Sequence, residues 1–437
     1  MADLMIIDPA SRQHALDLIN FIDASPSPWQ AVESMSEHLL GNGFELLSES
    51  DQWKLEPGHR YFTVRGGSSL IAFVQGQDTT KNRGLRIVGA HTDSPGLRLK
   101  PKAAFNSDSM IRIGVEVYGS PILATFTDRD LSLAGRVNIR SVTGFDTKLL
   151  KIESPLLRLP NLAIHMNREV NEKGLKLNRQ IELPLILGAT EEHDANTYFL
   201  SLIANHLNIE PKEIITFDLN VYDTQKGILW GANEEYVANS QLDNLASCHA
   251  ALNALVACEN PDSTCLCAFF DHEEVGSDSA LGANGSFLTD IIQRIGISNK
   301  LDEQSRLCSL SRSFFISADM AHAYNPNFPS AYEPCHHALI NNGPVIKTNV
   351  NQRYSTASDT AAHFMQLCEM SDVPFQQYAH RSDLGCGSTI GPIIAARLGV
   401  PSVDVGSAMW AMHSLRESAG VLDHSFMIKV MKTHFTQ

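Results

Sequence analysis

The stretch Thr264-Cys-Leu-Cys-Ala-Phe-Phe270-Asp-His-Glu-Glu274 joins an apolar run directly to a charged one. Six apolar residues after Thr264, with no polar residue among them, are typical of a strand that is buried on both faces. Four ionisable side chains then follow where that strand would end. Since ligands gather at the carboxyl ends of strands in doubly wound sheets, we expect the chemistry of the protein at this edge.

Apolar strands of the same kind recur along the chain and alternate with helical patterns. The alternation predicts an α/β fold with a mixed, largely parallel sheet sandwiched by helices. Expected helices span residues 11–23, 28–41, 243–259 and 357–370, and expected strands span residues 60–65, 69–75, 85–90, 264–270, 313–318 and 402–405.

The middle of the chain has a different character. Strand-like alternation dominates in residues 111–118 and 131–137, with many turn residues and few long helical patterns. A chain of 437 residues also exceeds the size at which one core usually stops growing. We therefore expect a β-rich domain inserted at residues 97–235 into a domain made of residues 1–96 plus 236–437.

Composition restricts the location and the partners of the protein. Lys and Arg number 34 against 49 Asp and Glu, and a net charge of −15 argues against nucleic acid and anionic membranes as partners. Eight cysteines without a CxxC pair, several inside apolar runs, fit buried free thiols in a reducing compartment. The N-terminus lacks a basic leader, and no run of about 20 apolar residues could span a bilayer. A cytoplasmic protein is expected.

Histidines and carboxylates follow the expected strands or begin a helix at five places. Any one of them has an ordinary structural explanation, such as a helix cap for Asp243 or a solvated turn for the acidic run after Phe270. Together they supply His, Asp, Glu, Asp and His, a set that suits two divalent ions with one bridging carboxylate. The residues are His91, Asp243, the pair Glu273 and Glu274, Asp319 and His413.

Two spacings near these residues indicate supporting roles. Asp93 lies two residues after His91, so both side chains face the same way and the carboxylate can hold the imidazole. In the pair Glu273 and Glu274, one carboxylate can ligate a metal while its neighbour acts as general base towards a metal-activated water. No cysteine occurs at the five places, which argues against a structural zinc site of the cysteine type.

Seven ordered motifs give the chain a resemblance to a known family. It resembles, nearly from end to end, the aspartyl aminopeptidase family, peptidase family M18, which has a two-zinc aminopeptidase-like catalytic domain. The motifs are Gly89-Ala-His-Thr-Asp-Ser-Pro-Gly, Leu159-Pro-Asn-Leu-Ala-Ile-His-Met, Ser240-Gln-Leu-Asp-Asn, Phe270-Asp-His-Glu-Glu-Val-Gly-Ser, Asp319-Met-Ala-His-Ala, Gly343-Pro-Val-Ile-Lys and Ala411-Met-His-Ser.

The resemblance assigns a role to each of these side chains. It implies that two Zn²⁺ ions bind per subunit, although His and carboxylate ligands also accept Co²⁺ or Mn²⁺. His91 and Asp319 would hold one ion, Glu274 and His413 the other, and Asp243 would bridge them, with Glu273 as general base and Asp93 orienting His91. The resemblance also implies that the insert serves dimerisation within a tetrahedral dodecamer built from dimers, with His165 reaching towards a neighbouring subunit's active site.

The expected reaction is the removal of N-terminal Asp or Glu residues from peptides by a water that the two metals activate. Because an acidic protein offers no bulk attraction to such substrates, their selection needs a local cation. Lys347 is the candidate partner of the substrate's side-chain carboxylate, and Arg353 and Tyr354 line the same region. Asp271 or Glu273 would bind the α-amino group, and His322 would donate to the developing oxyanion.

Two other kinds of function remain open at this point. The same metals can serve a broad-specificity exopeptidase or an amide deacylase, and Lys347 is the residue that discriminates an acidic specificity from these alternatives. A non-catalytic assembly or cargo protein could retain the fold and use metals only for structure. The presence of Glu273 argues against that reading, because a structural metal site needs no general base.

Overall fold

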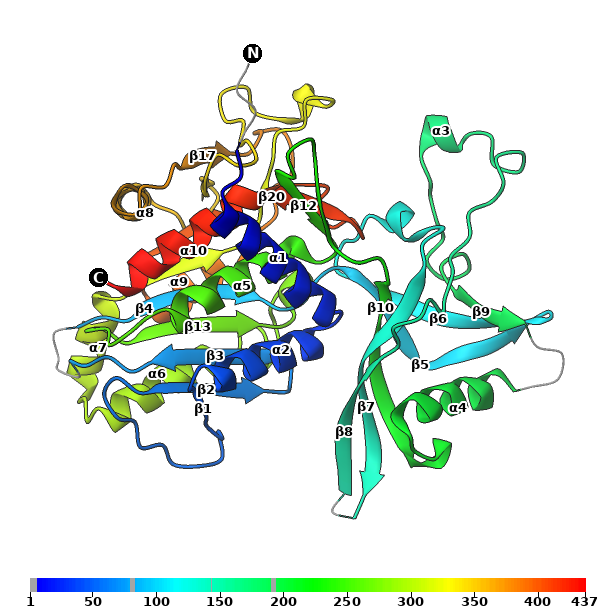
Figure 1. Cartoon of the computed structure of the whole chain (residues 1–437), viewed down its shortest axis with the longest axis horizontal. Helices are drawn as coiled ribbons and strands as arrows, with labels where there is room; N and C mark the ends of the chain where they lie inside the picture. Colours follow the sequence, from blue (N-terminus) through cyan, green and yellow to red (C-terminus); the bar gives the residue numbers. More distant parts are fainter. Residues whose placement is uncertain (1–5, 79–82, 143, 190–193) are drawn as a thin grey trace.

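The computed structural model describes residues 6–78, 83–142, 144–189 and 194–437. They form two lobes, which Figure 1 shows side by side. The larger lobe has a nine-stranded sheet between layers of helices, and the smaller lobe is built on a separate six-stranded sheet. No helix of the described residues is both long and apolar enough to cross a membrane.

The nine-stranded sheet confirms the expected fold class. Among the described residues, five of its eight strand pairs are parallel and three are antiparallel. Its strands are, in spatial order, β1 (Glu45–Leu46), β2 (Arg60–Arg65), β3 (Ser69–Val74), β13 (Cys265–Phe270), β4 (Arg86–His91), β14 (Phe314–Ala318), β18 (Ser402–Gly406), β16 (Val345–Thr348) and β17 (Gln376–Ala379).

Both faces of this sheet are covered, which explains why its strands are apolar throughout. Along β13, Cys267 and Phe269 belong to one core, whereas Leu266 and Ala268 belong to the core on the other face. The first core is closed by α2 (Pro28–Gly41), α5 (Leu242–Val256), α8 (Ser358–Met370) and α10 (Val421–Phe435). The second is closed by α6 (Phe287–Ser298), α7 (Glu303–Ser311) and α9 (Ile390–Leu398).

The first helix, α1 (Pro9–Ala24), lies outside this layer against α5 and α10. Its expected apolar stripe of Ala15, Leu18, Ile19 and Ile22 is buried, which confirms the prediction from periodicity. The helix begins where Asp8 accepts hydrogen bonds from the N–H groups of the first turn and Pro9 fixes the backbone angle.

The six-stranded sheet is antiparallel and has its own core. Its spatial order is β8 (Gly144–Lys151), β7 (Leu131–Ser141), β10 (Ile214–Asp223), β5 (Gly96–Ser107), β6 (Met110–Tyr118) and β9 (Leu185–Ala189). A helix that the sequence analysis missed, α4 (Ala195–Leu207), contributes Phe199 and Ile203 to this core. A short helix, α3 (Val170–Lys173), lies in the long connection between β8 and β9.

A third, five-stranded sheet combines strands from distant parts of the chain. It has the order β11 (Ile228–Trp230), β12 (Tyr236–Asn239), β20 (Glu417–Gly420), β19 (Ala408–Trp410) and β15 (Ala321–His322). β10 is the last strand of the six-stranded sheet along the chain and ends at Asp223, and the next strand, β11, already pairs with β12. The six-stranded sheet therefore ends before the expected boundary at 235. The division into two domains, with dimerisation as the task of the insert, stays a prediction.

The cysteines are all free thiols, as expected, but they are not all buried. Cys248, Cys258, Cys265, Cys267 and Cys368 are buried in the larger lobe. Cys308 and Cys335 are exposed, so the expectation of burial is wrong for these two. Neither belongs to an apolar run, which is the pattern on which the expectation rested.

Candidate metal centre

Three neighbouring strands of the nine-stranded sheet bring candidate ligands to one edge. β4 lies between β13 and β14 and runs parallel to both. β4 ends at His91, β13 ends just before residues 271–274, and β14 ends just before Asp319. Because parallel strands end at the same edge, the order of the strands alone brings these segments together.

The other two candidate ligands come from the five-stranded sheet. Asp243 lies at the start of α5, directly after β12, and His413 lies in the connection between β19 and β20. Glu417, a buried residue of β20, accepts the N–H of Asp243 at 3.0 Å and that of His413 at 2.7 Å. One buried carboxylate therefore fixes the backbone of both segments.

The five side chains converge around Asp243. Its Oδ1 lies 3.5 Å from Nε2 of His91, and its Oδ2 lies 3.5 Å from Nε2 of His413. Nε2 of His91 is also 3.6 Å from Oδ1 of Asp319, and Nε2 of His413 is 3.5 Å from Oε1 of Glu274. Each oxygen of Asp243 thus faces a different histidine, which itself faces a different second carboxylate.

This spacing fits metal ions better than direct hydrogen bonds. Two donor atoms that bind one tetrahedral zinc ion at its usual bond lengths lie about 3.4 Å apart. The four nitrogen–oxygen distances are 3.5–3.6 Å, at or beyond the limit for a hydrogen bond. Moreover, the buried Oδ1 of Asp243 has no hydrogen-bond partner among the described residues. A buried carboxylate oxygen without a donor is costly unless a cation satisfies it.

The hydrogen bonds of His91 and His413 leave Nε2 of each ring available to bind a metal. Nδ1 of His91 lies 2.9 Å from the carbonyl oxygen of Asp93, and Nδ1 of His413 lies 3.1 Å from the carbonyl oxygen of Ser120. A carbonyl oxygen can only accept, so Nδ1 donates in both rings. Nε2, which faces the carboxylates, is then free to bind a metal.

Asp93 differs in detail from the expectation. The backbone carbonyl of Asp93 holds His91, whereas its carboxylate lies 3.5 Å from the ring. That carboxylate instead accepts the N–H groups of Glu273 and Glu274, both at 3.1 Å, and the hydroxyl of Tyr118 at 2.6 Å. The turn after β13 provides the two N–H donors and the end of β6 provides the hydroxyl, and sequence spacing reveals neither.

Crowding of carboxylates perturbs the protonation of the site. Burial, reinforced by the charges of Asp319 and Asp93, raises the pKa of Glu273 to about 8. Burial and the charge of Asp243 raise the pKa of Glu274 well above its ordinary value. Burial lowers the pKa of His91, but Asp243, Asp319 and Asp93 together outweigh this and raise it well above its ordinary value. The chain alone therefore holds protons where cations would neutralise the same charges.

These side chains line a cavity of about 700 Å³. Lys347 of β16 is on its wall, with 2% of its surface exposed. Its ammonium group donates to the carbonyl oxygens of Asp319 at 3.0 Å and Met320 at 3.1 Å, and lies 5.0 Å from the ring centre of Tyr354. Lys347 is therefore a buried cation beside Asp319.

His322 of β15 is also on the cavity wall. Burial, helped by the charges of Lys347 and His380, lowers the pKa of His322 to about 4. The ring is consequently neutral near pH 7 and carries one N–H that can donate a hydrogen bond.

Three predicted substrate-binding residues lie elsewhere. Asp271 is fully buried, accepts the N–H of His272 at 2.8 Å, and is absent from the described residues that line the cavity. Arg353 is exposed and lines an adjoining cavity, which shares Gly385 with the first. His165 is exposed in the smaller lobe. Of the two candidates for the α-amino group, only Glu273 faces the cavity.

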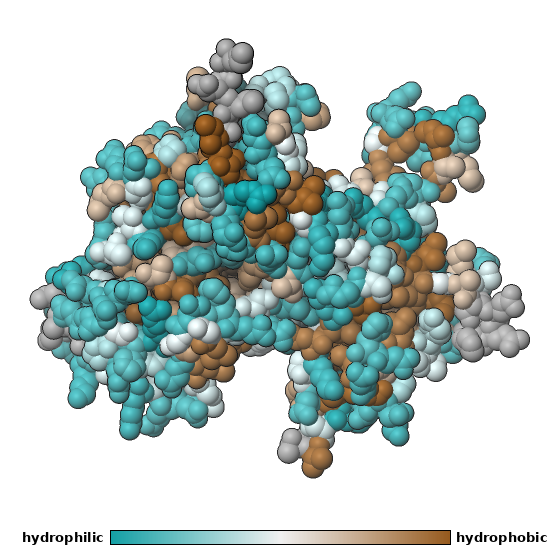
Figure 2. Space-filling model, in the orientation of Figure 1, coloured by the Kyte–Doolittle hydropathy of each residue, from teal (hydrophilic) through white to brown (hydrophobic). Residues whose placement is uncertain are grey.

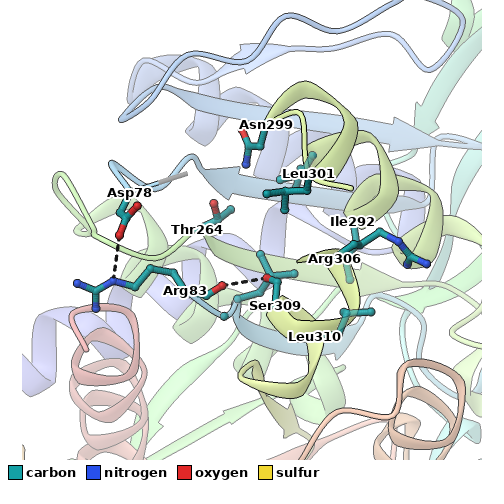
Figure 3. A pocket seen from close by; sticks show the side chains of 13 residues that line it. Asp78, Arg83, Thr264, Ile292, Asn299, Leu301, Arg306, Ser309 and Leu310 are labelled. Atoms are coloured by element: carbon teal, nitrogen blue, oxygen red, sulfur yellow. Dashed lines mark hydrogen bonds and ion pairs between the residues drawn. The ribbon is translucent and has the colours of Figure 1, made fainter. Parts of the chain in front are cut away.

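Another pocket, shown in Figure 3, lies at the opposite end of the sheet, where Leu85 and Thr264 precede β4 and β13. It holds only about 40 Å³. Figure 3 shows the ion pair between Arg83 and Asp78, and the hydroxyl of Ser309 directed at the carbonyl of Arg83. The described residues that line this pocket include neither His nor Glu. The candidate metal ligands are therefore found at the opposite end of the sheet, where β4, β13 and β14 end.

Sequence reasoning missed three residues around the metal centre. Tyr118 and Glu417 have the contacts given above, and the side chain of Asn244 donates to the carbonyl of Ala318 at 2.8 Å, tying the Asp243 segment to the end of β14. Only Asn244 carried a signal, because it belongs to one of the seven motifs. Tyr118 ends an ordinary strand pattern, and Glu417 is a single acidic residue in a weakly patterned segment.

The sequence comparisons agree with each other. The family described as "Aminopeptidase I zinc metalloprotease (M18)" matches residues 21–435. "Probable M18 family aminopeptidase 2" of Pseudomonas syringae pv. syringae (strain B728a) is 43% identical over 421 residues, which cover 96% of this chain and 97% of that protein. The protein of the same description from Clostridium acetobutylicum is 42% identical over 421 residues, or 95% and 97% of the two chains.

Solved structures extend the agreement to three dimensions. A chain in the cryo-EM structure of the Ape4 and Nbr1 complex is 38% identical with a TM-score of 0.94, and the match covers 99% of this chain and 88% of that one. Yeast aminopeptidase 1 (Ape1) is 26% identical with a TM-score of 0.86, and 97% of each chain is covered. These matches, together with the site, confirm the resemblance: the chain belongs to the M18 family of zinc metalloproteases and is a metal-dependent aminopeptidase.

Proposed function

We propose that this aminopeptidase removes Asp and Glu residues from peptide N-termini with two zinc ions per subunit. The observation that carries the acidic specificity is the charge of Lys347. Of the described residues that line the cavity, Lys347 is the only lysine or arginine. Being 2% exposed, it is screened little by water and would interact strongly with a carboxylate that enters the cavity.

The proposed ligands follow the two halves of the centre. His91 and Asp319 would hold one ion, Glu274 and His413 the other, and Asp243 would contribute one oxygen to each. The distances of 3.5–3.6 Å and the unpartnered oxygen of Asp243 support this assignment. Zinc follows from the description of the family, while Co²⁺ and Mn²⁺ accept the same donors.

Bound zinc supplies Lewis-acid chemistry, which polarises the scissile carbonyl and makes water acidic enough to be ionised near neutral pH. The residues of the chain then move the protons. Glu273 is on the cavity wall with Oε2 3.9 Å from Nε2 of His91, so it is placed to take a proton from the attacking water and give it to the leaving amine. The N–H of neutral His322 would stabilise the oxyanion.

Lys347 would act on the substrate while also holding Asp319. The longest of its three polar contacts runs to Oδ2 of Asp319 at 3.4 Å, against 3.0 and 3.1 Å for the two carbonyl oxygens. A substrate carboxylate would take over this weakest contact, which leaves the two shorter hydrogen bonds in place. Tyr354, whose ring lies below the ammonium group, would form the wall of the same subsite.

The smaller lobe supports a proposed homo-oligomer. Figure 2 shows apolar patches on this lobe, including the projecting loop that carries α3. In that loop Leu162, Ile164 and Met166, on both sides of His165, are 47–76% exposed. Clustered exposed apolar residues mark protein contacts. One relative of known structure, 26% identical, is the S. cerevisiae mApe1 dodecamer. A tetrahedral dodecamer built from dimers, with His165 completing a neighbour's cavity, is the arrangement we propose.

Replacing Glu273 tests catalysis separately from metal binding. Glu273→Gln keeps the size of the side chain but removes the base, so turnover should fall by roughly 10²–10⁴-fold while the zinc content stays at the wild-type level. Zinc analysis and peptide hydrolysis, measured on one preparation, check both. Glu369→Gln, an exposed change on α8, is the control. Unchanged turnover in the Glu273→Gln variant would show that Glu273 is not the general base. A wild-type protein without hydrolytic activity would favour a non-catalytic assembly role.

The raised pKa of His91 predicts that zinc binding weakens in acid. In the metal-free chain a proton occupies Nε2 of His91 at any pH below that raised pKa, and zinc must displace it. The affinity should therefore fall about tenfold per pH unit for each proton released as the pH is lowered. Competition with a chelator of known affinity, between about pH 6 and pH 8, measures this slope. An affinity independent of pH would contradict the proposed role of His91.

Lys347 discriminates the proposed specificity from a broad exopeptidase or an amide deacylase. Lys347→Ala should reduce the preference for Asp- and Glu-peptides over neutral peptides by roughly 30–1,000-fold, the value of a buried charge pair of about 2–4 kcal/mol. Because Lys347 also contacts Asp319, kcat/KM is compared as a ratio between substrates at saturating zinc. Lys429→Ala, an exposed lysine on α10, serves as the control. Equal losses for acidic and neutral peptides would reject the acidic specificity.

Changes in the projecting loop test the oligomer. His165→Ala should leave the mass of the particle unchanged and lower kcat/KM by roughly tenfold or more, since it removes a group from a neighbour's cavity without touching the apolar contacts. Leu162→Ser with Met166→Ser should instead reduce the mass measured by light scattering. His206→Ala, exposed on α4, is the control. A wild-type monomer with full activity would eliminate both the assembly and the role of His165.

A further inference from the structure

The connection that leaves the six-stranded sheet after β6 touches both halves of the candidate metal centre. With Tyr118, the last residue of β6, it makes up residues 118–122 and leads into the short 3₁₀ helix η1 (Leu123–Phe126). Tyr118 contacts the His91 side of the centre, and Ser120 and Ile122 contact the His413 side. One five-residue segment of the smaller lobe therefore reaches side chains that come from two sheets of the larger lobe.

Tyr118 completes the hydrogen bonding of a fully buried carboxylate. Its hydroxyl donates to Oδ2 of Asp93 at 2.6 Å, the shortest hydrogen bond to that carboxylate. The other donors are the N–H groups of Glu273 and Glu274, so Asp93 ties Tyr118 to the turn that carries the proposed base and one proposed ligand. The guanidinium group of Arg98 on β5 lies 3.5 Å from the ring centre of Tyr118, which fixes the ring from the other side.

The same segment holds His413 at two points. The carbonyl oxygen of Ser120 accepts a hydrogen bond from Nδ1 of its ring at 3.1 Å, which directs Nε2 at Asp243 and Glu274. The N–H of Ile122 donates to the backbone carbonyl of His413 at 2.9 Å. Both the ring and the backbone of this proposed ligand are thus oriented from the smaller lobe.

Gly119 allows the close approach between these two contacts. A Cβ atom at this position would lie 3.2 Å from Cβ of Glu274 and 3.3 Å from its carbonyl oxygen. The φ angle of Gly119 is +64°, a conformation that favours glycine. The segment therefore packs directly on the Glu274 backbone, between its contacts to Asp93 and to His413.

We propose that residues 118–122 are a positioning segment through which the six-stranded sheet sets the geometry of both metal positions, with Tyr118 acting on the His91 half through Asp93. The inference rests on the proposed two-metal site. Outer hydrogen-bond partners of metal ligands orient those ligands, and their loss typically weakens metal binding by 10- to 100-fold. If Tyr118 merely fills space at the junction of the lobes, its hydroxyl makes no contribution to metal binding.

The test compares the zinc affinities of two variants that each lose one tyrosine hydroxyl. Tyr118→Phe should weaken zinc binding by roughly 10- to 100-fold, measured by chelator competition on the full chain. Tyr222→Phe is the matched control, because its hydroxyl donates to the carbonyl oxygen of Ile152 at 2.7 Å in the same lobe. Its zinc affinity should equal that of the wild type, and both metal-free variants should unfold at similar temperatures. Equal zinc affinities for the two variants would overturn the inference.

A double-mutant cycle tests whether Tyr118 acts through Asp93. Asp93→Asn should weaken zinc binding, and adding Tyr118→Phe should then cost little more, because the two changes remove one connection. Losses that multiply would overturn the pathway, and this result remains available if either single variant is less stable. A wild-type chain that binds fewer than two zinc ions would defeat the proposed function, whereas a normal wild type with an unaffected Tyr118→Phe defeats this inference alone.

Discussion

The repulsion between buried carboxylates is the constraint on which the rest of this site depends. Asp243, Glu273, Glu274 and Asp319 share one cavity with Asp93 directly behind it, and several of them are nearly excluded from water. Burial and the neighbouring charges raise the pKa of Glu273, Glu274 and His91, so without cations bound protons reduce this repulsion. Divalent cations neutralise the same charges, so metal binding and the integrity of the cavity are linked.

Two carboxylates, Asp93 and Glu417, hold the crowded site together by accepting hydrogen bonds from backbone N–H groups. Asp93 accepts the N–H groups of Glu273 and Glu274, and Glu417 accepts those of Asp243 and His413. Backbone donors cannot rotate away, so Asp93 holds the one turn that carries Glu273 and Glu274, whereas Glu417 holds two separate segments. Neither carboxylate competes for the Nε2 atoms that face the centre of the site. Candidate ligands from the nine-stranded sheet and from segments joined to the five-stranded sheet are thereby held with nitrogen–oxygen distances of 3.5–3.6 Å.

The sequence predicts the parts of this arrangement that depend on period and order. Buried strands are recognisable in the sequence as apolar runs. The residues at the ends of the parallel strands β4, β13 and β14 lie at one edge of the sheet, so the convergence of His91 and Asp319 with the acidic turn was predictable. His413 was a candidate by its residue type and by the family resemblance, but strand order alone did not position it, because it lies in a connection between short strands. The roles of Tyr118 and Glu417 could not be predicted either, since each residue bonds to partners far away in the chain.

The helix α4 and Asp271 show the complementary limits of pattern reading. α4 lies in a segment that we read as β-rich, and its apolar side is apparent only once the core of the smaller lobe is known. Asp271 stands beside three plausible functional residues, yet its carboxylate is enclosed and accepts the N–H of His272. A motif identifies the segment that carries the chemistry, but the turn of the backbone decides which of its side chains enter the cavity.

Lys347 combines a proposed role in substrate selection with a structural role beside a proposed metal ligand. Its ammonium group donates to the carbonyl oxygens of Asp319 and Met320, so the proposed selector of acidic substrates also fixes a proposed metal ligand. Desolvating a lysine is costly, and these hydrogen bonds with the nearby Asp319 carboxylate offset the cost before any substrate arrives. In the proposed specificity the substrate's carboxylate would meet a cation that is already in place, and a preformed partner in a poorly solvated site discriminates strongly between charged and neutral side chains.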